Sequence, residues 1–162
     1  MVDTPATLRA TADEPGLDQS RLTRLVGYAA SRASIELKKA FARHMAPMQL
    51  KAVEFSILTL VASNPGVNQK QIAQTLDLSA PNMAMTLDRL VERGWVQRVR
   101  STRDRREQQI HLTSKGRELE KRASEIALEM EVEPLLVLSP AERALLIELL
   151  LKVAKGRQRV RT

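Results

Sequence analysis

The sequence predicts a mainly α-helical fold with one small β-hairpin, and three observations support this fold class. Apolar residues recur at the three- and four-residue spacing of amphipathic helices over most of the chain. Two short helical patterns follow each other within residues 68–94 and are separated by a turn at residues 76–78. Two runs, residues 95–99 and 108–112, then alternate apolar and polar side chains as strands do. Helix, turn, helix and hairpin in this order describe a winged helix-turn-helix.

The first helix of this pair is expected to begin directly after Asn68. Asparagine is a favourable N-cap residue, and Gln71, three residues further on, completes a capping box. Ile72, Ala73 and Leu76 then recur at helical spacing. Together these signals predict a short helix that ends at the turn.

The second helix has both a start signal and a stop signal. Ser79 is a favourable N-cap residue, and Pro81 suits the first turn because its missing N–H would have no helical partner there. Gly94 ends the helix as a left-handed cap residue would. One face of the helix is apolar and consists of Met83, Leu87, Leu90 and Val91. The opposite face, which we expect to be exposed, carries Asn82, Met85, Thr86 and Arg89.

Positive charge is concentrated around the predicted hairpin. The chain of 162 residues has a formal net charge of +7, which favours a polyanionic partner. Residues 89–106 contain seven arginines against two acidic residues, Glu92 and Asp104, a local balance of +5. A solvated loop is the alternative, although such a loop more often mixes lysine with glutamate. Arginine forks onto phosphates and fits narrow grooves, so we expect this segment to contact a nucleic acid.

Four motifs in this segment resemble the DNA-binding lobe of the MarR family of bacterial transcription regulators. The motifs are Leu78-Ser79 before the second helix, Leu87-Asp88-Arg89-Leu90 inside it, Arg93-Gly94-Trp95-Val96 after it, and Asp104-Arg105-Arg106 followed by Leu112-Thr113-Ser114-Lys115-Gly116. The last motif is the most specific, because a helix-turn-helix alone occurs in many proteins. The likeness extends more loosely over residues 20–155.

The resemblance implies that the second helix is a recognition helix in the major groove of double-stranded DNA, where side chains near its N-terminus reach base edges. Asn82 then pairs with adenine, and Arg89 reaches guanine or a phosphate. Met85 and Thr86 pack on thymine methyl groups. Alternatively, Asn82 only caps the first turn. The residues of this helix assigned to DNA contact are Ser79, Pro81, Asn82, Met85, Thr86 and Arg89.

This helix and the hairpin tip differ in how closely they match the family. Ala84 and Met85 stand where small hydroxyl and basic residues are common in the family, so base recognition is expected to use apolar contacts and DNA shape. In the wing, Arg106 matches the family arginine that enters the minor groove, and Asp104 matches the acid that orients the wing arginines. The neighbouring arginines are expected to contact phosphates, and they are Arg103 and Arg105.

Further helices are expected on both sides of this motif. The first runs from residue 18 to residue 45 and carries two adjacent apolar stripes. The second, residues 51–63, is apolar nearly all round, as a central core helix would be. Thr113 can cap a long helix that begins at Ser114, and Pro134 is expected to interrupt this helix. Residues 139–142 then form a capping box with proline at the first position of the last helix.

The last helix predicts a homodimer. Its leucines at positions 145, 146, 149, 150 and 151 cover more than half of its circumference, which suits burial between subunits. The resemblance implies the same arrangement, since the first and last two helices of that family intertwine into a dimer lobe. We therefore expect a flexible arm at residues 1–17, a dimerisation region at 18–45 and 114–155, a DNA-binding region at 46–113, and a basic tail at 156–162. The tail either adds phosphate contacts or only increases solubility.

Composition argues against several function classes. The chain has no cysteine, which excludes disulfides, thiolate metal sites and thiol-based redox sensing. It has two histidines, His44 and His111, and no paired acidic site. Its most apolar run, residues 144–151, is interrupted by Glu148 and falls well short of the ~20 residues of a membrane span. We expect a cytoplasmic protein that is not an enzyme, uses no metal or cofactor and does not bind a membrane.

Two functions remain open. The resemblance implies a repressor that leaves an inverted-repeat operator when a small aromatic or phenolic acid, or its thioester, binds between the two lobes. Tyr28 and Arg32 lie one turn apart and suit an aromatic carboxylate, and His44 and Met48 lie near the end of the same helix. The alternative for Tyr28 and Arg32 is packing at the dimer seam. The second function is that of an effector-independent or architectural DNA-binding protein, which no ligand would release from DNA.

Overall fold

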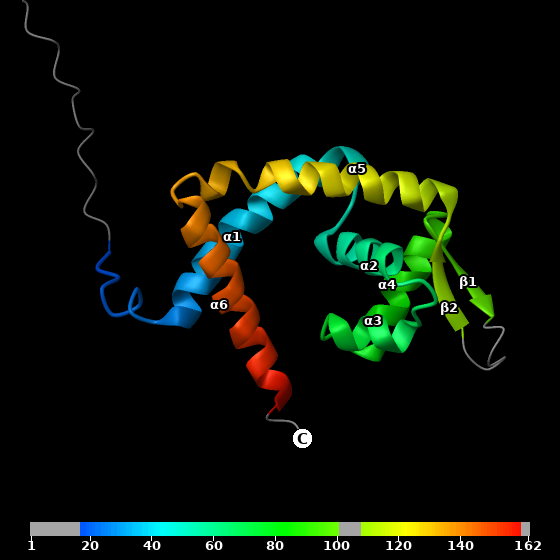
Figure 1. Ribbon diagram of the computed structural model, residues 1–162, viewed down its shortest axis with the longest axis horizontal. Coiled ribbons are helices and arrows are strands. Elements are labelled where there is room, and N and C mark those ends of the chain that lie inside the picture. The colour runs from blue at the N-terminus through cyan, green and yellow to red at the C-terminus, as the bar shows by residue number, and fades with distance from the viewer. Residues whose placement is uncertain (1–16, 101–107, 160–162) are drawn as a thin grey trace, which may run out of the picture. The chain divides into compact units, whose positions relative to one another are not determined.

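The fold is given by a computed structural model, which describes residues 17–100 and 108–159 (Figure 1). These residues form six α-helices, two 3-10 turns and one antiparallel two-stranded hairpin, so the predicted fold class is confirmed. The chain divides into two compact units, Met1–Ser34 and Ile35–Thr162, and the boundary falls inside the first helix.

The first unit contains a series of turns followed by the beginning of helix α1, Val26–Met45. The Ser20 N–H donates to Asp18 Oδ1 at 2.9 Å, and the Thr23 N–H donates to the Gln19 carbonyl at 3.0 Å. Bonds of the first kind, from a backbone N–H to a nearby aspartate side chain, compete with helix formation. The predicted helix start at residue 18 is therefore wrong, and the turns occupy that part of the chain.

The second unit contains the rest of α1 and all the other elements. In chain order these are a 3-10 turn η1 (Ala46–Met48), α2 (Ala52–Ser63), α3 (Gln69–Thr75), α4 (Ala80–Glu92), β1 (Val96–Arg100), β2 (Gln108–Leu112), α5 (Ser114–Met130), a second 3-10 turn η2 (Glu133–Leu135) and α6 (Pro140–Arg159).

The predicted caps of α3 and α4 are confirmed. Asn68 Oδ1 accepts from the Gln71 N–H, and Gln71 Oε1 accepts from the Asn68 N–H, both at 2.9 Å. Ser79 Oγ accepts from the Asn82 N–H at 3.4 Å. Gly94 follows α4 with φ +70°, a left-handed conformation that glycine adopts without steric cost. These local signals fix where each helix of the pair begins and where the second one ends.

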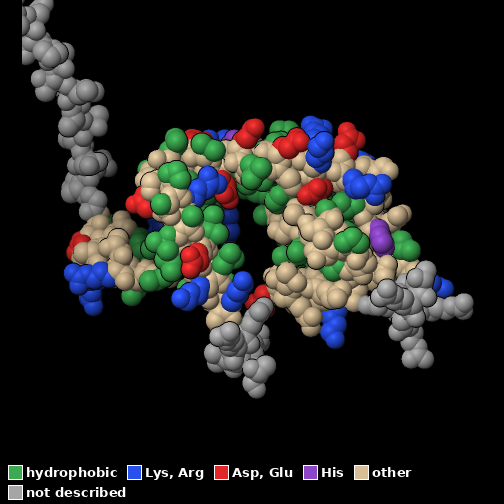
Figure 2. All heavy atoms as spheres, in the orientation of Figure 1, with side chains coloured by type: hydrophobic (Ala, Val, Ile, Leu, Met, Phe, Trp, Pro, Cys, Tyr) green, Lys and Arg blue, Asp and Glu red, His purple; other side chains and the backbone are tan. Residues whose placement is uncertain are grey.

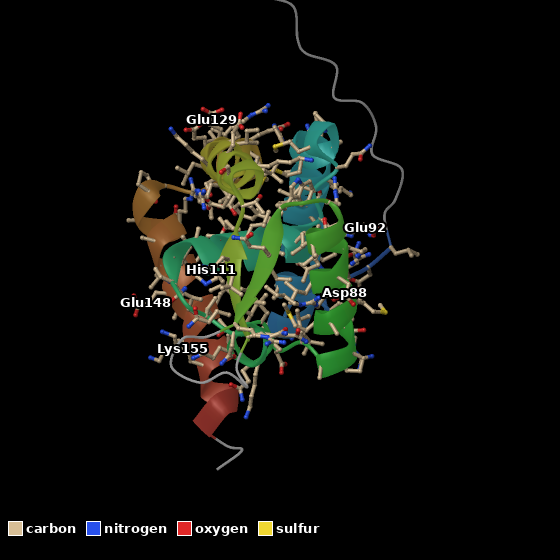
Figure 3. All side chains as sticks on the ribbon, turned by 90° about the vertical axis from the view of Figure 1, so that its right-hand side faces the viewer. Asp88, Glu92, His111, Glu129, Glu148 and Lys155 are labelled. Atoms are coloured by element: carbon tan, nitrogen blue, oxygen red, sulfur yellow. The ribbon has the colours of Figure 1, made fainter. Side chains whose placement is uncertain are left out.

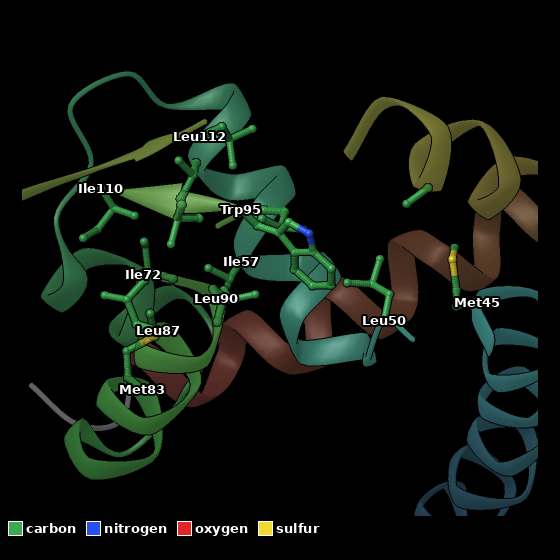
Figure 4. Packing of buried hydrophobic residues seen from close by; sticks show 14 of the residues in the cluster. Met45, Leu50, Ile57, Ile72, Met83, Leu87, Leu90, Trp95, Ile110 and Leu112 are labelled. Carbon is green, nitrogen blue, oxygen red and sulfur yellow. The ribbon is translucent and has the colours of Figure 1, made fainter. Parts of the chain in front are cut away.

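The core of the second unit lies where α2, α4 and the hairpin meet. Ile57 and Leu58 of α2 are fully buried, which confirms the prediction of a central core helix. Figure 4 shows the apolar residues of α4 beside those of α2 and α3 in one cluster. Fully buried members of this cluster include Met45, Met83, Leu87 and Leu90. Burying one such side chain contributes about 1.5–3 kcal/mol, so this cluster holds α4 by its inner face.

The hairpin is held by the chain segment that precedes α3. β1 and β2 pair antiparallel with Val96 opposite Leu112 and Arg100 opposite Gln108. On the other edge of β2, the Ile110 N–H donates to the Val67 carbonyl at 2.8 Å. Ile110 and Leu112 are buried, while His111 between them is half-buried. The base of the wing is therefore fixed to the helix-turn-helix.

Helix α5 begins very close to the base of the hairpin. Thr113 is its N-cap, and the Thr113 hydroxyl accepts from the Gly116 N–H at 3.0 Å. The same hydroxyl donates to the Gly94 carbonyl at 2.7 Å. A Cβ atom at position 116 would lie 1.9 Å from the Trp95 carbonyl oxygen, so only glycine fits there. The Leu-Thr-x-x-Gly motif thus joins the wing to α5, which packs along α2 (Figure 1).

The C-terminal part of the chain exposes a large apolar surface. Pro134 interrupts the helix as predicted, within η2, and the Ser139–Glu142 capping box opens α6. Helix α6 continues to Arg159, so the predicted tail from residue 156 is helical over its first residues. Apolar side chains reach the surface along α6 in Figure 2. The exposed ones are Leu145, Leu146, Ile147, Leu149, Leu150, Leu151 and Val153, at 37 % to 71 %.

Within residues 17–100 and 108–159, no single helix is both long enough and apolar enough to cross a membrane. The segments Val26–Met48 and Ala52–Ser63 reach the required length and composition only when they are taken together as a bent pair.

Candidate nucleic-acid interface

Helix α4 has one buried face and one exposed face, as predicted. Met83, Leu87 and Leu90 are fully buried, whereas Met85 is 61 % exposed. Ser79, Pro81 and Asn82 at the start of the helix are also exposed. Figure 3 shows Asp88 and Glu92 following each other along the outer part of the same helix. The structure therefore brings together, on one helix, most of the side chains that were assigned to base contact.

Asn82 has a side chain that is available for a ligand. Its backbone N–H donates to Ser79 Oγ, so Ser79 and not Asn82 caps the first turn. Its side-chain amide makes no hydrogen bond with any part of the chain that the structure describes. An exposed primary amide offers a donor and an acceptor side by side, which is the pattern that the major-groove edge of adenine matches.

Thr86 lies on the buried side of α4, so its predicted exposure is wrong. The residue is 6 % exposed, and its hydroxyl donates to the Asn82 carbonyl at 2.8 Å. This bond to the carbonyl one turn earlier holds the side chain against the helix. Of the two residues assigned to thymine contact, only Met85 is therefore exposed, and the contacts themselves stay predictions.

Arg89 of α4 and Arg93, the residue that follows the helix as its C-cap, lie four residues apart and both face a buried carboxylate. The Glu54 side chain is 2 % exposed, and its oxygens lie 3.9 Å from Arg89 Nε and 3.8 Å from Arg93 Nη1. Arg93 also donates to the Gln49 carbonyl at 2.8 Å and lies 3.6 Å above the centre of the Trp95 ring. Arg93 is thus bound within the protein, while Arg89 keeps a side chain that is 43 % exposed.

The positive charge near the wing is partly neutralised by the protein itself. Arg98 of β1 donates to Asp88 of α4 at 2.6 Å, which ties this strand to α4. Together with the pairing of Arg93 and Glu54, this accounts for two of the seven arginines counted from the sequence. The local balance of +5 therefore overstates the charge that is free to contact a partner. Arg100 at the end of β1 is exposed.

The predicted wing contacts lie in the connection between β1 and β2, outside the described residues. They are Arg103, Asp104, Arg105 and Arg106. What the structure does place is the base of this connection, where Arg100 and Gln108 pair across the hairpin. The assignments of these four residues to the minor groove and to phosphates stay predictions.

The residues assigned to an effector are divided between the two units. In the first unit, the Tyr28 hydroxyl donates to Gln19 Oε1, and Arg32 is exposed. In the second unit, His44 is half-buried with Nδ1 2.9 Å from the carbonyl oxygen four residues earlier. Met48 packs against the core, and its carbonyl accepts from Arg93 at 3.4 Å. The assignment of these residues to a ligand stays a prediction.

Glu54 is the functional candidate that the sequence analysis did not identify. The residue stands at the third position of α2, in a helix whose neighbouring residues are apolar nearly all round. A single charged residue in such a pattern is a detectable signal, because burial of a charge requires a charged or hydrogen-bonding partner. The identity of the partners, Arg89 and Arg93, depends on the packing of α4 against α2 and is not visible in the sequence.

Known proteins resemble this chain over the helix-turn-helix and the hairpin. A family model described as the MarR family matches residues 48–107, from η1 to the loop of the hairpin. The uncharacterized HTH-type transcriptional regulator YpoP of Bacillus subtilis (strain 168) is 33 % identical over 109 residues, which are 67 % of this chain and 77 % of YpoP. The HTH-type transcriptional regulator PecS of Dickeya dadantii (strain 3937) is 31 % identical over 146 residues, 88 % of this chain and 87 % of PecS.

Solved structures show the same fold over most of this chain. The transcriptional repressor CouR, bound to a 23-mer DNA duplex, matches with a TM-score of 0.80 and 38 % identity, and the match covers 86 % of this chain and 99 % of CouR. CouR bound to p-coumaroyl-CoA matches with a TM-score of 0.77 and 36 % identity, over 86 % of this chain and 98 % of CouR.

Proposed function

Because this chain belongs to the MarR family of DNA-binding transcriptional regulators, we propose that it is a repressor that binds an inverted-repeat operator as a homodimer and leaves it when a small aromatic acid, or its thioester, binds. The observation that carries the first part is the exposed face of α4. Its inner face is fixed in the core, and Asn82 and Met85 project from the outer face. A dimer would place two such helices in successive major grooves about 34–36 Å apart.

The exposed apolar surface of α6 supports the homodimer. Contiguous apolar patches of this kind mark interaction sites, because leaving them in water is unfavourable. Leu149 and its apolar neighbours on α6 are each more than one third exposed in the single chain. Obligate dimer interfaces are large and apolar, like a domain core cut in half. A second copy of the chain, which has the same apolar helix, would cover this surface.

An effector of the aromatic class is supported by the likeness to CouR. One CouR structure holds a DNA duplex and another holds p-coumaroyl-CoA, an aromatic acid in thioester linkage. In this chain Tyr28 and Arg32 of the first unit would supply an aromatic ring and a cation for such a ligand, and His44 and Met48 of the second unit are the other residues proposed to contact it. A ligand releases the protein from DNA only if the ligand binds the DNA-free state of the protein more tightly than the DNA-bound state.

Two binding measurements test this function. Selection of random duplexes by the purified protein should enrich an inverted repeat with half-sites one helical turn apart, and loss of symmetry in the enriched sites would contradict the dimeric repressor. Titration of the protein–operator complex with p-coumaroyl-CoA, free p-coumarate and benzoate should then release DNA, with acetyl-CoA as the control for the coenzyme portion. If none of these aromatic compounds lowers operator affinity, the effector-independent alternative is the better description.

A further inference from the structure

Glu54 is a buried carboxylate directly behind the recognition helix. Its side chain is 2 % exposed, and Oε2 accepts from the Lys51 N–H at 3.0 Å at the start of α2. The amide oxygen of a glutamine can accept this bond as well as a carboxylate can, so the bond to Lys51 does not require a charge at this position. Burying a charge is costly unless the charge is paired, and two arginines, Arg89 and Arg93, face this carboxylate.

The two carboxylate oxygens of Glu54 face different arginines. Oε2 lies 3.8 Å from Arg93 Nη1, and Oε1 lies 3.9 Å from Arg89 Nε. Arg93 donates to carbonyl groups at the η1 turn, those of Gln49 and Met48, and stacks on Trp95. Arg93 therefore ties the end of α4 to η1, and Glu54 lies between that tie and the DNA-facing Arg89.

Arg89 depends on the charge of Glu54 for its orientation. Its Nε is buried and has no hydrogen-bond partner among the described residues, so the nearby carboxylate is what compensates this N–H. On the same edge of the guanidinium as Nε, Nη2 donates to Thr86 Oγ1 at 3.4 Å. With Nε directed inward and Nη2 attached to α4, the remaining guanidinium edge is left for a base or a phosphate.

We propose that Glu54 is a positioning residue for DNA recognition, which holds Arg89 in the orientation that reads the operator. The proposal rests on the DNA-binding function proposed above, and it assigns a role to a residue that does not itself touch DNA. A guanidinium held on one edge loses less freedom when it binds a base, whereas an unheld one attaches to any nearby phosphate. Glu54 thus favours operator over unrelated DNA and does not simply strengthen binding.

The variant Glu54→Gln separates charge from capping, because the glutamine side chain still accepts from the Lys51 N–H. We expect the ratio of the dissociation constants for a scrambled duplex and the selected operator to fall about tenfold. The matched control is Glu142→Gln, the same substitution at the same capping position of α6, where the carboxylate accepts from Ser139 and faces no arginine of α4. This control changes net charge equally and should leave the ratio unchanged.

A double variant identifies Arg89 as the residue through which Glu54 acts. In an Arg89→Ala background, Glu54→Gln should no longer change the ratio, because the side chain that it positions is absent. Equal loss of affinity for both duplexes would indicate a merely structural role and overturn the proposal. Persistence of the tenfold effect in the Arg89→Ala background would overturn it as well, since Glu54 would then act through another group.

A measurement on the free protein keeps the test independent of the operator. The Nε–H proton of Arg89, assigned by its loss in Arg89→Lys, should exchange slowly with water in the wild type because Nε is buried. In Glu54→Gln the exchange should become fast, while Glu142→Gln should retain the wild-type rate. Slow exchange in both variants would overturn the proposal even if the proposed operator binding is confirmed. Failure of the wild type to prefer any duplex would instead contradict the proposed function.

Discussion

At position 116, the backbone of α5 approaches the Trp95 carbonyl so closely that a Cβ atom would lie 1.9 Å from the oxygen. A Cβ atom is fixed rigidly to the backbone of α5, and the Trp95 oxygen belongs to the backbone, so no side-chain rotation can relieve this contact. The neighbouring cap, Thr113, binds both the Gly94 carbonyl and the Gly116 N–H. A single small residue therefore sets the distance between the wing and the long helix, which explains the glycine of the Leu-Thr-x-x-Gly motif in physical terms.

Replacing this glycine should destabilise the protein strongly. We expect Gly116→Ala to lower the free energy of unfolding by more than about 2 kcal/mol, because α5 or β1 must shift to relieve the overlap. The matched control is Gly156→Ala in α6, where a Cβ atom meets nothing within 4 Å. There alanine should stabilise the helix by up to about 1 kcal/mol. Urea unfolding at equal protein concentration measures both changes, and equal effects would contradict the steric explanation.

Asn82 provides the second prediction at this scale. Its amide is exposed, and Ser79 already caps the helix, so removal of the amide should leave stability nearly unchanged. We expect Asn82→Ala to weaken operator binding by about 1–3 kcal/mol per half-site and to relax preference mainly at one base position. Binding to a set of operator variants, each with one base pair changed, measures this. A uniform loss across all variants would show that Asn82 contacts the DNA backbone instead.

Single residues also show where sequence reasoning fails. Helical spacing placed Thr86 on the exposed face of α4, but its hydroxyl bonds back to the Asn82 carbonyl and the residue is buried. The arginine count treated Arg93 and Arg98 as free, although Glu54 and Asp88 pair with them. Both errors come from contacts between elements, which a periodic pattern along one helix does not contain.

Among the elements, helix boundaries were predicted best where a side chain caps the helix. Asn68, Ser79 and Thr113 were each assigned as caps, and each accepts from the backbone N–H three residues later. The start of α1 was predicted poorly, because the apolar spacing continues upstream of Val26 while local turns occupy that stretch. Capping signals depend on neighbouring residues alone, whereas the length of an amphipathic helix depends on what its apolar stripe packs against.

The capping box of α6 makes a pH-dependent contribution to that helix. Hydrogen bonds from the Ser139 hydroxyl and then from the Ser139 backbone N–H hold the pKa of Glu142 below its ordinary value of 4.5. A carboxyl group with a lowered folded-state pKa stabilises the fold above its unfolded pKa and loses that contribution as the pH falls through the folded pKa. The unfolding free energies of wild type and Glu142→Gln should therefore differ near neutral pH, and the difference should shrink as the pH falls below 4.5. A difference that is constant with pH would contradict this assignment.

Two arginines of the wing, Arg105 and Arg106, are expected to contribute differently to DNA binding. Arg106 is assigned to the minor groove, where narrow A/T-rich stretches concentrate negative potential. Arg106→Ala should weaken binding broadly, lower the salt dependence and reduce the preference for A/T-rich flanks. Arg105→Ala should reduce affinity without changing that preference, which makes it the matched control. Titrations at several salt concentrations decide this, and an unchanged salt slope in Arg106→Ala would mean that the wing does not touch DNA.

For the molecule as a whole, the most informative feature is apolar surface that one chain leaves uncovered. Both units contribute to it separately, with Leu25 and Val26 exposed in the first unit and Leu145 to Val153 exposed in the second. The sequence predicted this surface from the width of the leucine face on the last helix. It could not show which partner covers that face, because one chain contains no information on contacts between chains.

The final prediction concerns that partner. If a second copy of the chain covers α6, the protein is a stable dimer at micromolar concentration, and its unfolding depends on protein concentration. Leu149 is 48 % exposed in the single chain, so Leu149→Glu should cost little in an isolated subunit. In the dimer the same change would bury an unpaired carboxylate and should therefore dissociate or unfold the protein.

The matched control for Leu149→Glu is Gln74→Glu, which adds the same charge at an exposed position of α3. Sedimentation equilibrium should give a dimer for the wild type and for Gln74→Glu, and a monomer or unfolded chain for Leu149→Glu. A wild-type protein that sediments as a stable, folded monomer at micromolar concentration would exclude the homodimer. It would also remove the geometric basis for an inverted-repeat operator, because a single recognition helix reads one half-site only.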